Sequence, residues 1–261
     1  MASLANKVFA ITGGASGMGL ATGRQLAAAK ARAVAIGDYN DQAFDEARKQ
    51  LKAANPDVEV LTTKLNVADP AQVDAWIEEI VAKFGALDGA VNAAGVAQPV
   101  GARQSPTLLA ETNEEWNRVI GVNLAGVFYS NRAQIKAMTS LEKRDRSIVN
   151  ISSMASLLHG GDCYSYGVSK TGVAYLTTCI AKDVKQFGIR VNTISPSATR
   201  TPMLAQFFAG TAGAESITSA ADTGGFNLVE ADDIARTVLW LLSEDASQVF
   251  GVNLPVGDTV P

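Results

Sequence analysis

The chain has 261 residues, 47% of them hydrophobic, and a formal net charge of -4. This length and composition suffice for a large core, so we expect one domain over residues 1–261. The acidic balance and the scattered Lys and Arg side chains argue against nucleic-acid binding, and no apolar run approaches the roughly 18 residues of a membrane span. We expect a cytoplasmic protein without a signal peptide, and with two cysteines and one histidine we expect no metal site.

Residues 7–12 form a short apolar run that ends in glycines, and an alanine-rich helical pattern follows Gly19. Strand, glycine turn and helix in this order bring backbone N–H groups and a helix N-terminus to one point, where a pyrophosphate can bind. The alternative is that the glycines only join the strand to the helix. The residues of this predicted phosphate-binding turn are Gly13, Ser16, Gly17, Met18 and Gly19.

A second apolar run, residues 33–36, is followed by Asp38 and Tyr39. An acidic side chain in this position accepts hydrogen bonds from the adenosine ribose hydroxyls and repels a 2′-phosphate, so it predicts NAD rather than NADP. The alternative is that Asp38 or Asp41 simply caps the next helix, residues 41–54.

Residues 58–65 and 89–91 are predicted as the third and fourth strands, and the helix between them begins at Asp69-Pro70 and ends at Gly85. Small residues after a strand allow a cofactor to lie close to the backbone. Such residues follow the fourth strand as Asn92, Ala93, Ala94 and Gly95, while Asn66 and Val67 follow the third.

A long helix is predicted to begin at Thr112, because its spacing from Glu115 is that of a capping box. Asn123 lies inside this helix. Without further information, an Asn inside a helix is equally well explained as an exposed residue without function or as a functional residue.

Tyr166 and Lys170 are four residues apart at the start of a helical pattern that runs to Phe187, so both side chains lie on one face. A nearby ammonium favours the phenolate and lowers the tyrosine pKa, which makes Tyr166 a candidate general acid or base. Ser153 follows the predicted strand 147–151 and can face the phenol. The alternative is an ordinary pair on a helix surface.

These features occur in a fixed order along the chain. They are Thr12-Gly13, Gly17-Met18-Gly19, Asn92-Ala93-Ala94-Gly95, Asn123, Ser153, Tyr166 and Lys170. In their residues and spacing, the chain resembles the short-chain dehydrogenase/reductase family along nearly its whole length. The resemblance implies a single-domain, doubly wound α/β (Rossmann) fold with a roughly seven-stranded parallel sheet and helices on both faces.

The resemblance also implies an NAD(H)-dependent oxidoreductase that interconverts a secondary alcohol and a ketone. Tyr166 exchanges the hydroxyl proton, Ser153 holds the substrate oxygen, Lys170 binds the nicotinamide ribose, and Asn123 holds a water that links Lys170 to solvent. Relatives are commonly paired through two long helices, so the resemblance predicts a homo-oligomer, either a tetramer or a dimer.

Further cofactor contacts are expected after the strand 189–194, where Ser197 stands in the place of a glycine in relatives. These contacts are Pro196, Thr199, Thr201 and Met203. Asn66 replaces an Asp that lies near the adenine in relatives, and its carbonyl oxygen can still accept a hydrogen bond.

Apolar side chains around the predicted pocket favour a bulky, apolar small molecule, although core packing explains half of them equally well. The expected substrate contacts are Ser153, Met154, His159, Tyr164, Tyr166, Leu204, Phe207 and Phe208. The composition of residues 203–228 suits a lid over the substrate, and the alternative is a surface loop without function.

Residues 230–243 are predicted as a helix and residues 253–256 as the last strand, where Pro255 indicates a sheet edge. Two other functions suit the same fold. One is a scaffold or sensor that binds NAD without redox turnover, and the other is a cyclase or isomerase.

Overall fold

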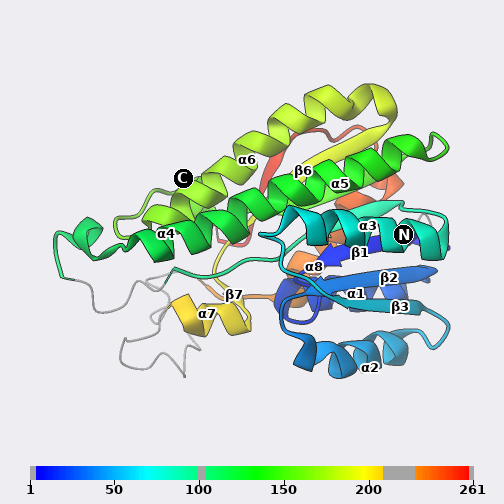
Figure 1. Ribbon diagram of the computed structural model, residues 1–261, viewed down its shortest axis with the longest axis horizontal. Coiled ribbons are helices and arrows are strands. Elements are labelled where there is room, and N and C mark those ends of the chain that lie inside the picture. Colours follow the sequence, from blue (N-terminus) through cyan, green and yellow to red (C-terminus); the bar gives the residue numbers. More distant parts are fainter. Residues whose placement is uncertain (1–3, 99–103, 208–226, 259–261) are drawn as a thin grey trace.

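The computed structural model describes residues 4–98, 104–207 and 227–258, and within them the chain forms an α/β fold around a parallel sheet (Figure 1). The sheet has seven strands in the order β3-β2-β1-β4-β5-β6-β9, which confirms the predicted architecture. Its strands are β1 (Val8–Thr12), β2 (Ala33–Asp38), β3 (Glu59–Lys64), β4 (Gly89–Asn92), β5 (Arg146–Ile151), β6 (Ile189–Pro196) and β9 (Asn253–Val256). A short pair, β7 (Thr199–Arg200) and β8 (Val229–Glu230), lies apart from this sheet.

Helices cover both faces of the sheet, and each face has its own core. On one side α1 (Gly17–Ala28) contacts both α2 (Phe44–Ala54) and α8 (Ala231–Leu242). On the other, α3 (Pro70–Phe84) contacts α5 (Gly126–Ser140), while α4 (Asn113–Ile120) contacts α6 (Tyr164–Val184).

The side chains of β1 show how the chain builds the two cores. Phe9 and Ile11 enter the core beneath α1 and α8, whereas Val8 and Ala10 enter the core beneath α3 and α5. Successive residues of a strand point to opposite faces. A strand buried on both faces therefore appears in the sequence as a continuous apolar run, as residues 7–12 do.

Several predicted helix ends are confirmed. The side chain of Asp69 accepts hydrogen bonds from Ala71 N and Gln72 N at the start of α3, and Gly85 ends that helix with a φ of 66°. Thr112 caps α4 by accepting from Glu115 N. Pro255 lies on β9, which is an edge strand as predicted.

The long helix predicted after Thr112 is interrupted. Between α4 and α5 the residues Gly121–Ala125 form a turn of π-helix. Such turns are rare, and they occur often at functional sites. Asn123 lies at the centre of this turn.

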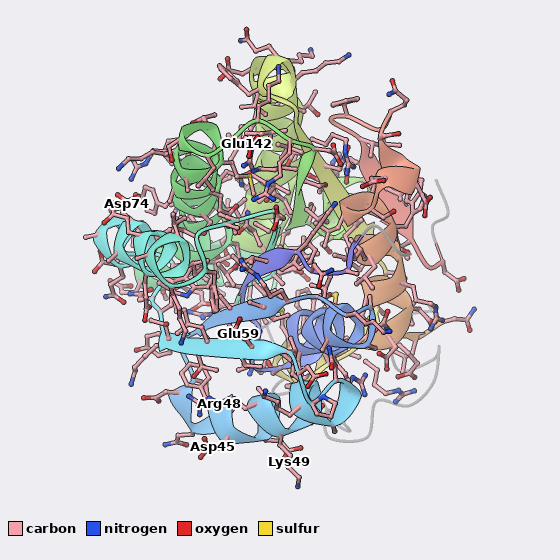
Figure 2. All side chains as sticks on the ribbon, turned by 90° about the vertical axis from the view of Figure 1, so that its right-hand side faces the viewer. Asp45, Arg48, Lys49, Glu59, Asp74 and Glu142 are labelled. Carbon is pink, nitrogen blue, oxygen red and sulfur yellow. The ribbon has the colours of Figure 1, made fainter. Side chains whose placement is uncertain are left out.

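Charged side chains of both signs share the outer surface. Figure 2 shows Asp45, Arg48 and Lys49 together on α2, where Arg48 Nη1 lies 2.7 Å from Asp45 Oδ1. Such mixed surface pairs contribute little to stability. Within the described ranges, no helix combines the length and the apolar character that crossing a bilayer requires.

Candidate active site

The largest cavity of the site lies over the carboxyl ends of β1, β2 and β4 and has a volume of about 530 Å³. In a doubly wound sheet, ligands bind at this end. Its lining brings together most of the predicted cofactor residues. These are Gly13, Ser16, Gly17, Met18, Gly19, Asp38, Tyr39, Asn66, Val67, Ala93, Ala94, Gly95, Thr201 and Met203.

The glycine turn after β1 leaves no room for side chains at two of its positions. Gly13 has a φ of 66°, and a Cβ there would lie 2.7 Å from Ala94 N. A Cβ at Gly19 would collide with the carbonyl oxygen of Gly13. The N-cap residue of α1, Ser16, makes no side-chain cap, so the N–H groups of the first turn are available to an anion.

Asp38 lies at the end of β2 and fixes the glycine turn from the side. Its Oδ2 accepts a hydrogen bond from Ala15 N at 2.9 Å, and its Oδ1 accepts one from Asn40 N at 3.0 Å. The N-cap of α2 is Ala43, so neither Asp38 nor Asp41 caps that helix. The next residue, Tyr39, is 73% exposed beside the cavity.

A second cavity of about 240 Å³ adjoins the first, because Met18, Thr201 and Met203 line both. Its walls are mainly apolar side chains and hydroxyl groups. The remaining lining residues are Ser152, Ser153, Met154, Ala155, Tyr166, Pro196, Ser197, Ala198, Thr199, Leu204 and Phe207.

Tyr166 and Ser153 line this second cavity, and Lys170 lies behind the Tyr166 ring and lines neither cavity. Lys170 is 4% exposed, and its Nζ donates to the carbonyl oxygen of Ile151 at 3.0 Å and lies 5.6 Å from the centre of the Tyr166 ring. Ser152 anchors the same turn of α6 by donating from Oγ to the Lys170 carbonyl at 2.7 Å. The Tyr166 ring packs edge-on against Phe207, with 5.4 Å between ring centres.

The electrostatics of this group differ from the sequence-based expectation. Burial raises the pKa of Tyr166 to about 12, while a hydrogen bond with Ser153 acts to lower it. Burial also lowers the pKa of Lys170 to about 8. The expected lowering of the Tyr166 pKa is therefore wrong for this structure, because burial of the phenol raises it.

Asn123 is fully buried, so it is not an exposed bystander. Its Oδ1 accepts from Val96 N at 2.8 Å, and its Nδ2 donates to the Val96 carbonyl at 3.0 Å. A Cβ at Gly95 would lie 3.3 Å from Asn123 Oδ1 and 3.7 Å from Lys170 Nζ. Asn123 thus holds the segment after β4 against the helix that carries Lys170.

Other predicted site residues lie elsewhere. The Asn92 side chain is 1% exposed and bonds Gln134 and Asn150 within the protein. His159 and Tyr164 line a separate surface cavity, and the Tyr164 hydroxyl lies 3.0 Å from Thr107 Oγ1.

Two further predictions concern the cofactor and the lid. Asn66 lines the larger cavity, but its Oδ1 already accepts from Ala68 N at 3.1 Å. Phe208 and most of the predicted lid lie outside the described residues, while α7 (Pro202–Phe207) places Met203, Leu204 and Phe207 at the second cavity.

Some residues of the site carry no sequence signal. Arg118 lines the larger cavity, where it bonds the Ala97 carbonyl at 2.8 Å and Glu115 at 2.6 Å. Ser197 lines the smaller cavity, and no hydrogen-bond partner of its buried hydroxyl occurs within the described part of the chain. Gln98 is completely buried beside the start of α6. Only the tertiary contacts single out Arg118 and Gln98, whereas Ser197 already differs in the sequence from the glycine of relatives.

Cys163 and Cys179 form no disulfide bond. No cluster of three or more His, Cys, Asp or Glu side chains suited to a metal ion occurs among the residues that the structure describes.

Comparison with known proteins identifies the family. A family model described as enoyl-(acyl carrier protein) reductase matches residues 13–258. The chain is 51% identical over 261 residues to a chanoclavine-I dehydrogenase of Penicillium roqueforti and 48% identical over 264 residues to one of Arthroderma otae, and each match covers 100% of both chains. The chain belongs to the short-chain dehydrogenase/reductase family.

A solved member of this family agrees with the assignment. The crystal structure of a short-chain dehydrogenase from Mycobacterium paratuberculosis bound to NAD is similar to this chain, with a TM-score of 0.83 and 25% identity over 98% of this chain and 97% of that one. The predicted family is therefore confirmed, and the chain is a nicotinamide-dependent oxidoreductase.

Proposed function

We propose that this short-chain dehydrogenase uses NAD to oxidise chanoclavine-I or a closely similar alcohol, with Tyr166 as the acid–base residue. The proposal is carried by one observation: Tyr166 and Ser153 line an apolar cavity that shares three residues with the larger, glycine-lined cavity. The names of the full-length relatives supply the candidate substrate.

The larger cavity fits a dinucleotide. Gly13 and Gly19 allow the backbone to approach a ligand where any Cβ would clash, and the start of α1 presents N–H groups to a pyrophosphate. Asp38 would accept from the adenosine ribose, and Tyr39 would cover the adenine. Thr201 and Met203, which line both cavities, and Pro196 and Thr199, which line the smaller one, would hold the nicotinamide end.

The charges of this cavity favour NAD over NADP. Asp38 places a carboxylate where a 2′-phosphate would lie. Among the described residues that line the cavity, Arg118 is the one cation, and it already pairs with Glu115. A 2′-phosphate would therefore meet a negative charge, and no unpaired cation among the described lining residues would offset it.

The bound cofactor supplies a hydride acceptor at nicotinamide C4. The chain's residues handle the proton and the orientation of the alcohol. Ser153 Oγ holds the substrate oxygen, Tyr166 accepts the hydroxyl proton as the C–H bond breaks and the carbonyl forms, and Lys170 binds the nicotinamide ribose. Asn123 holds the Val96 backbone against this group, next to the lysine.

The smaller cavity supports an apolar substrate. Within the described residues its lining contains no Asp, Glu, Lys, Arg or His, so Tyr166 is the one ionisable group at hand for the proton. Substrate affinity would then come from burial of apolar surface against Met154, Leu204 and Phe207.

The test is turnover, followed as NADH absorbance, with chanoclavine-I and a panel of secondary alcohols, each with NAD and with NADP. We expect turnover of chanoclavine-I with NAD. Turnover of secondary alcohols alone would show that the substrate is a secondary alcohol, as the family resemblance implies, and not chanoclavine-I. Tight NAD binding without turnover of any alcohol would favour the sensor or the cyclase interpretation.

We also propose that the chain forms a homo-oligomer through α5 and α6. Phe128 on α5 is 44% exposed and Val168 on α6 is 49% exposed, and burial of such side chains would favour association. Light scattering should give a dimer or tetramer mass, and the Phe128→Glu variant should shift it toward the monomer. A monomeric wild-type protein at micromolar concentration would refute this.

A further inference from the structure

The helix that carries Tyr166 begins without a cap of its own. The N-cap position of α6 is Cys163, and its side chain makes no cap hydrogen bond. An N-cap side chain usually accepts from the N–H of the second or third helical residue. In α6 the third residue is Tyr166, so the missing bond concerns the backbone of the tyrosine itself.

Gln98, which lies 68 positions earlier in the chain, supplies that bond. Its Oε1 accepts from Tyr166 N at 3.0 Å and from Ser165 Oγ at 3.1 Å. A single amide oxygen therefore accepts hydrogen bonds from two donors, the backbone N–H of the third helical residue and the side-chain hydroxyl of the second. Gln98 is completely buried, so water does not substitute for these bonds.

The nitrogen of the same amide fixes the loop before the helix. Gln98 Nε2 donates to the Asp162 carbonyl at 3.1 Å and to Glu111 Oε2 at 2.6 Å. Asp162 has a φ of 70°, a region that residues other than glycine seldom adopt. The bond from Gln98 helps to hold this conformation, because a strained residue persists only where its surroundings determine it.

We infer that Gln98 is a positioning residue for the acid–base tyrosine: its amide caps α6 from outside and sets where Tyr166 stands relative to Ser153 and the two cavities. This inference rests on the proposed function, since it assumes that Tyr166 exchanges the proton. Gln98 lines neither cavity, so it acts through the helix rather than on the substrate.

The expected consequence concerns chemistry more than cofactor affinity. Without the cap, the first turn of α6 can shift, and a displacement of about 1 Å at a reacting group can reduce a rate by about 100-fold. The glycine turn and Asp38 belong to other elements, so NADH binding should change little. A displaced Tyr166 would also lose the hydrogen bond with Ser153 that lowers its pKa, so alcohol oxidation would require a higher pH.

The experiment compares the Gln98→Met variant, which keeps the length of the side chain and removes the amide, with wild-type protein. Turnover is measured with chanoclavine-I, or with the panel alcohol that the wild-type protein oxidises. We expect kcat to fall by about 10- to 100-fold, the pH profile of oxidation to move to higher pH, and the NADH dissociation constant to stay within about twofold. The matched control is Asn192→Leu, which removes an equally buried amide that bonds Val249 and Val252, a segment that contacts α6 at Thr178 and not at the first turn.

A second comparison keeps the test valid if Gln98→Met does not fold. The Gln98→Glu variant keeps an acceptor for Tyr166 N but sets a carboxylate against Glu111. The double variant Gln98→Glu with Glu111→Gln exchanges the two side chains. Its amide at position 111 can donate to the carboxylate at position 98, where the wild-type contact between the two side chains is 2.6 Å. We expect the double variant to be at least about fivefold more active than Gln98→Glu alone.

Three results would overturn the inference: wild-type kcat and pH profile in Gln98→Met, an equal loss of kcat in Asn192→Leu, or a double variant no more active than Gln98→Glu. The Tyr166→Phe variant separates this failure from failure of the proposed function. If Tyr166→Phe retains turnover, the assignment of the tyrosine is wrong and the inference falls with it. If Tyr166→Phe is inactive and Gln98→Met is not impaired, only the role of Gln98 is wrong.

Discussion

The two ends of the parallel sheet hold buried charged groups in opposite ways. At the amino end, Arg190 on β6 is 1% exposed and donates to the carbonyl oxygens of Leu241, Leu242, Ser243 and Ala246 as well as to Asp145. At the carboxyl end, the ammonium of Lys170 has three donors and, within the described structure, one hydrogen bond, to Ile151.

The difference separates stability from function. Arg190 satisfies the last carbonyl groups of α8, which a helix end leaves without partners, and so joins that helix to the sheet. Lys170 keeps donors free beside Gly95, which lines the larger cavity, and burial lowers its pKa to about 8. A buried cation with spare donors is poorly explained by stability alone and well explained by a ligand.

The largest expected effect lies at the carboxyl end. Removal of the phenol hydroxyl in Tyr166→Phe should lower kcat by about 1,000-fold, because a positioned acid–base group contributes rates of that order. Thermal stability and NADH affinity should stay close to wild-type values. NADH absorbance and thermal unfolding measure the two effects.

A matched control for this variant lies on the same helix. Tyr175 is 75% exposed on α6, and Tyr175→Phe should leave kcat unchanged. Near wild-type turnover in Tyr166→Phe would contradict the role of the tyrosine.

The second effect lies at the amino end and should appear in stability, not in turnover. Arg190→Met removes every hydrogen bond that the buried guanidinium makes to four carbonyl groups and to Asp145, and it should lower the free energy of unfolding by about 3 kcal/mol. Urea unfolding measures this loss, with kcat measured below the unfolding transition. The control is Arg48→Met, which removes a 45% exposed partner of Asp45 and should cost less than about 1 kcal/mol.

The third effect concerns the coenzyme. Asp38→Asn removes the negative charge and keeps one oxygen that can accept from Ala15 N, so the ratio of kcat/KM for NADP to that for NAD should rise by about 10- to 100-fold. Initial rates with both coenzymes measure this ratio. Asp41→Asn, which removes a charge next to Lys64, should leave the preference unchanged.

The smallest effect is a pH dependence. A base must be deprotonated to accept a proton, and burial raises the pKa of Tyr166 to about 12, so alcohol oxidation should become faster as pH rises from about 7 to 10. Carbonyl reduction, which needs the protonated phenol, should not gain over the same range. An increase in oxidation that stops near pH 8 would report the loss of the Lys170 charge, because burial lowers the pKa of that amine to about 8.

Local patterns in the chain were sufficient for the fold and for much of the candidate site. Local signals mark the apolar run at residues 7–12, the strand at 189–194, the helix caps at Asp69 and Thr112, and the spacing of Tyr166 and Lys170. Each depends on neighbours within a few residues. Periodicity and capping act over that same range. They are therefore visible without any knowledge of long-range contacts.

Long-range contacts account for what the sequence did not show. Gln98 has no local pattern because its partners at Ser165 and Tyr166 lie far along the chain. The amide of Asn92 faces Gln134 and Asn150 inside the protein, although its sequence neighbours line the cavity. The direction of the pKa shift of Tyr166 follows from burial, which depends on every element packed around it.

The sequence by itself determined the order of strands and helices, the glycine turn and the helix face shared by Tyr166 and Lys170, because backbone geometry and side-chain periodicity encode them locally. Only the tertiary structure decided which amide caps the helix of Tyr166, which charges are fully paired, and which keep free donors. Those properties depend on atoms that approach one another only after residues distant in the sequence have packed together.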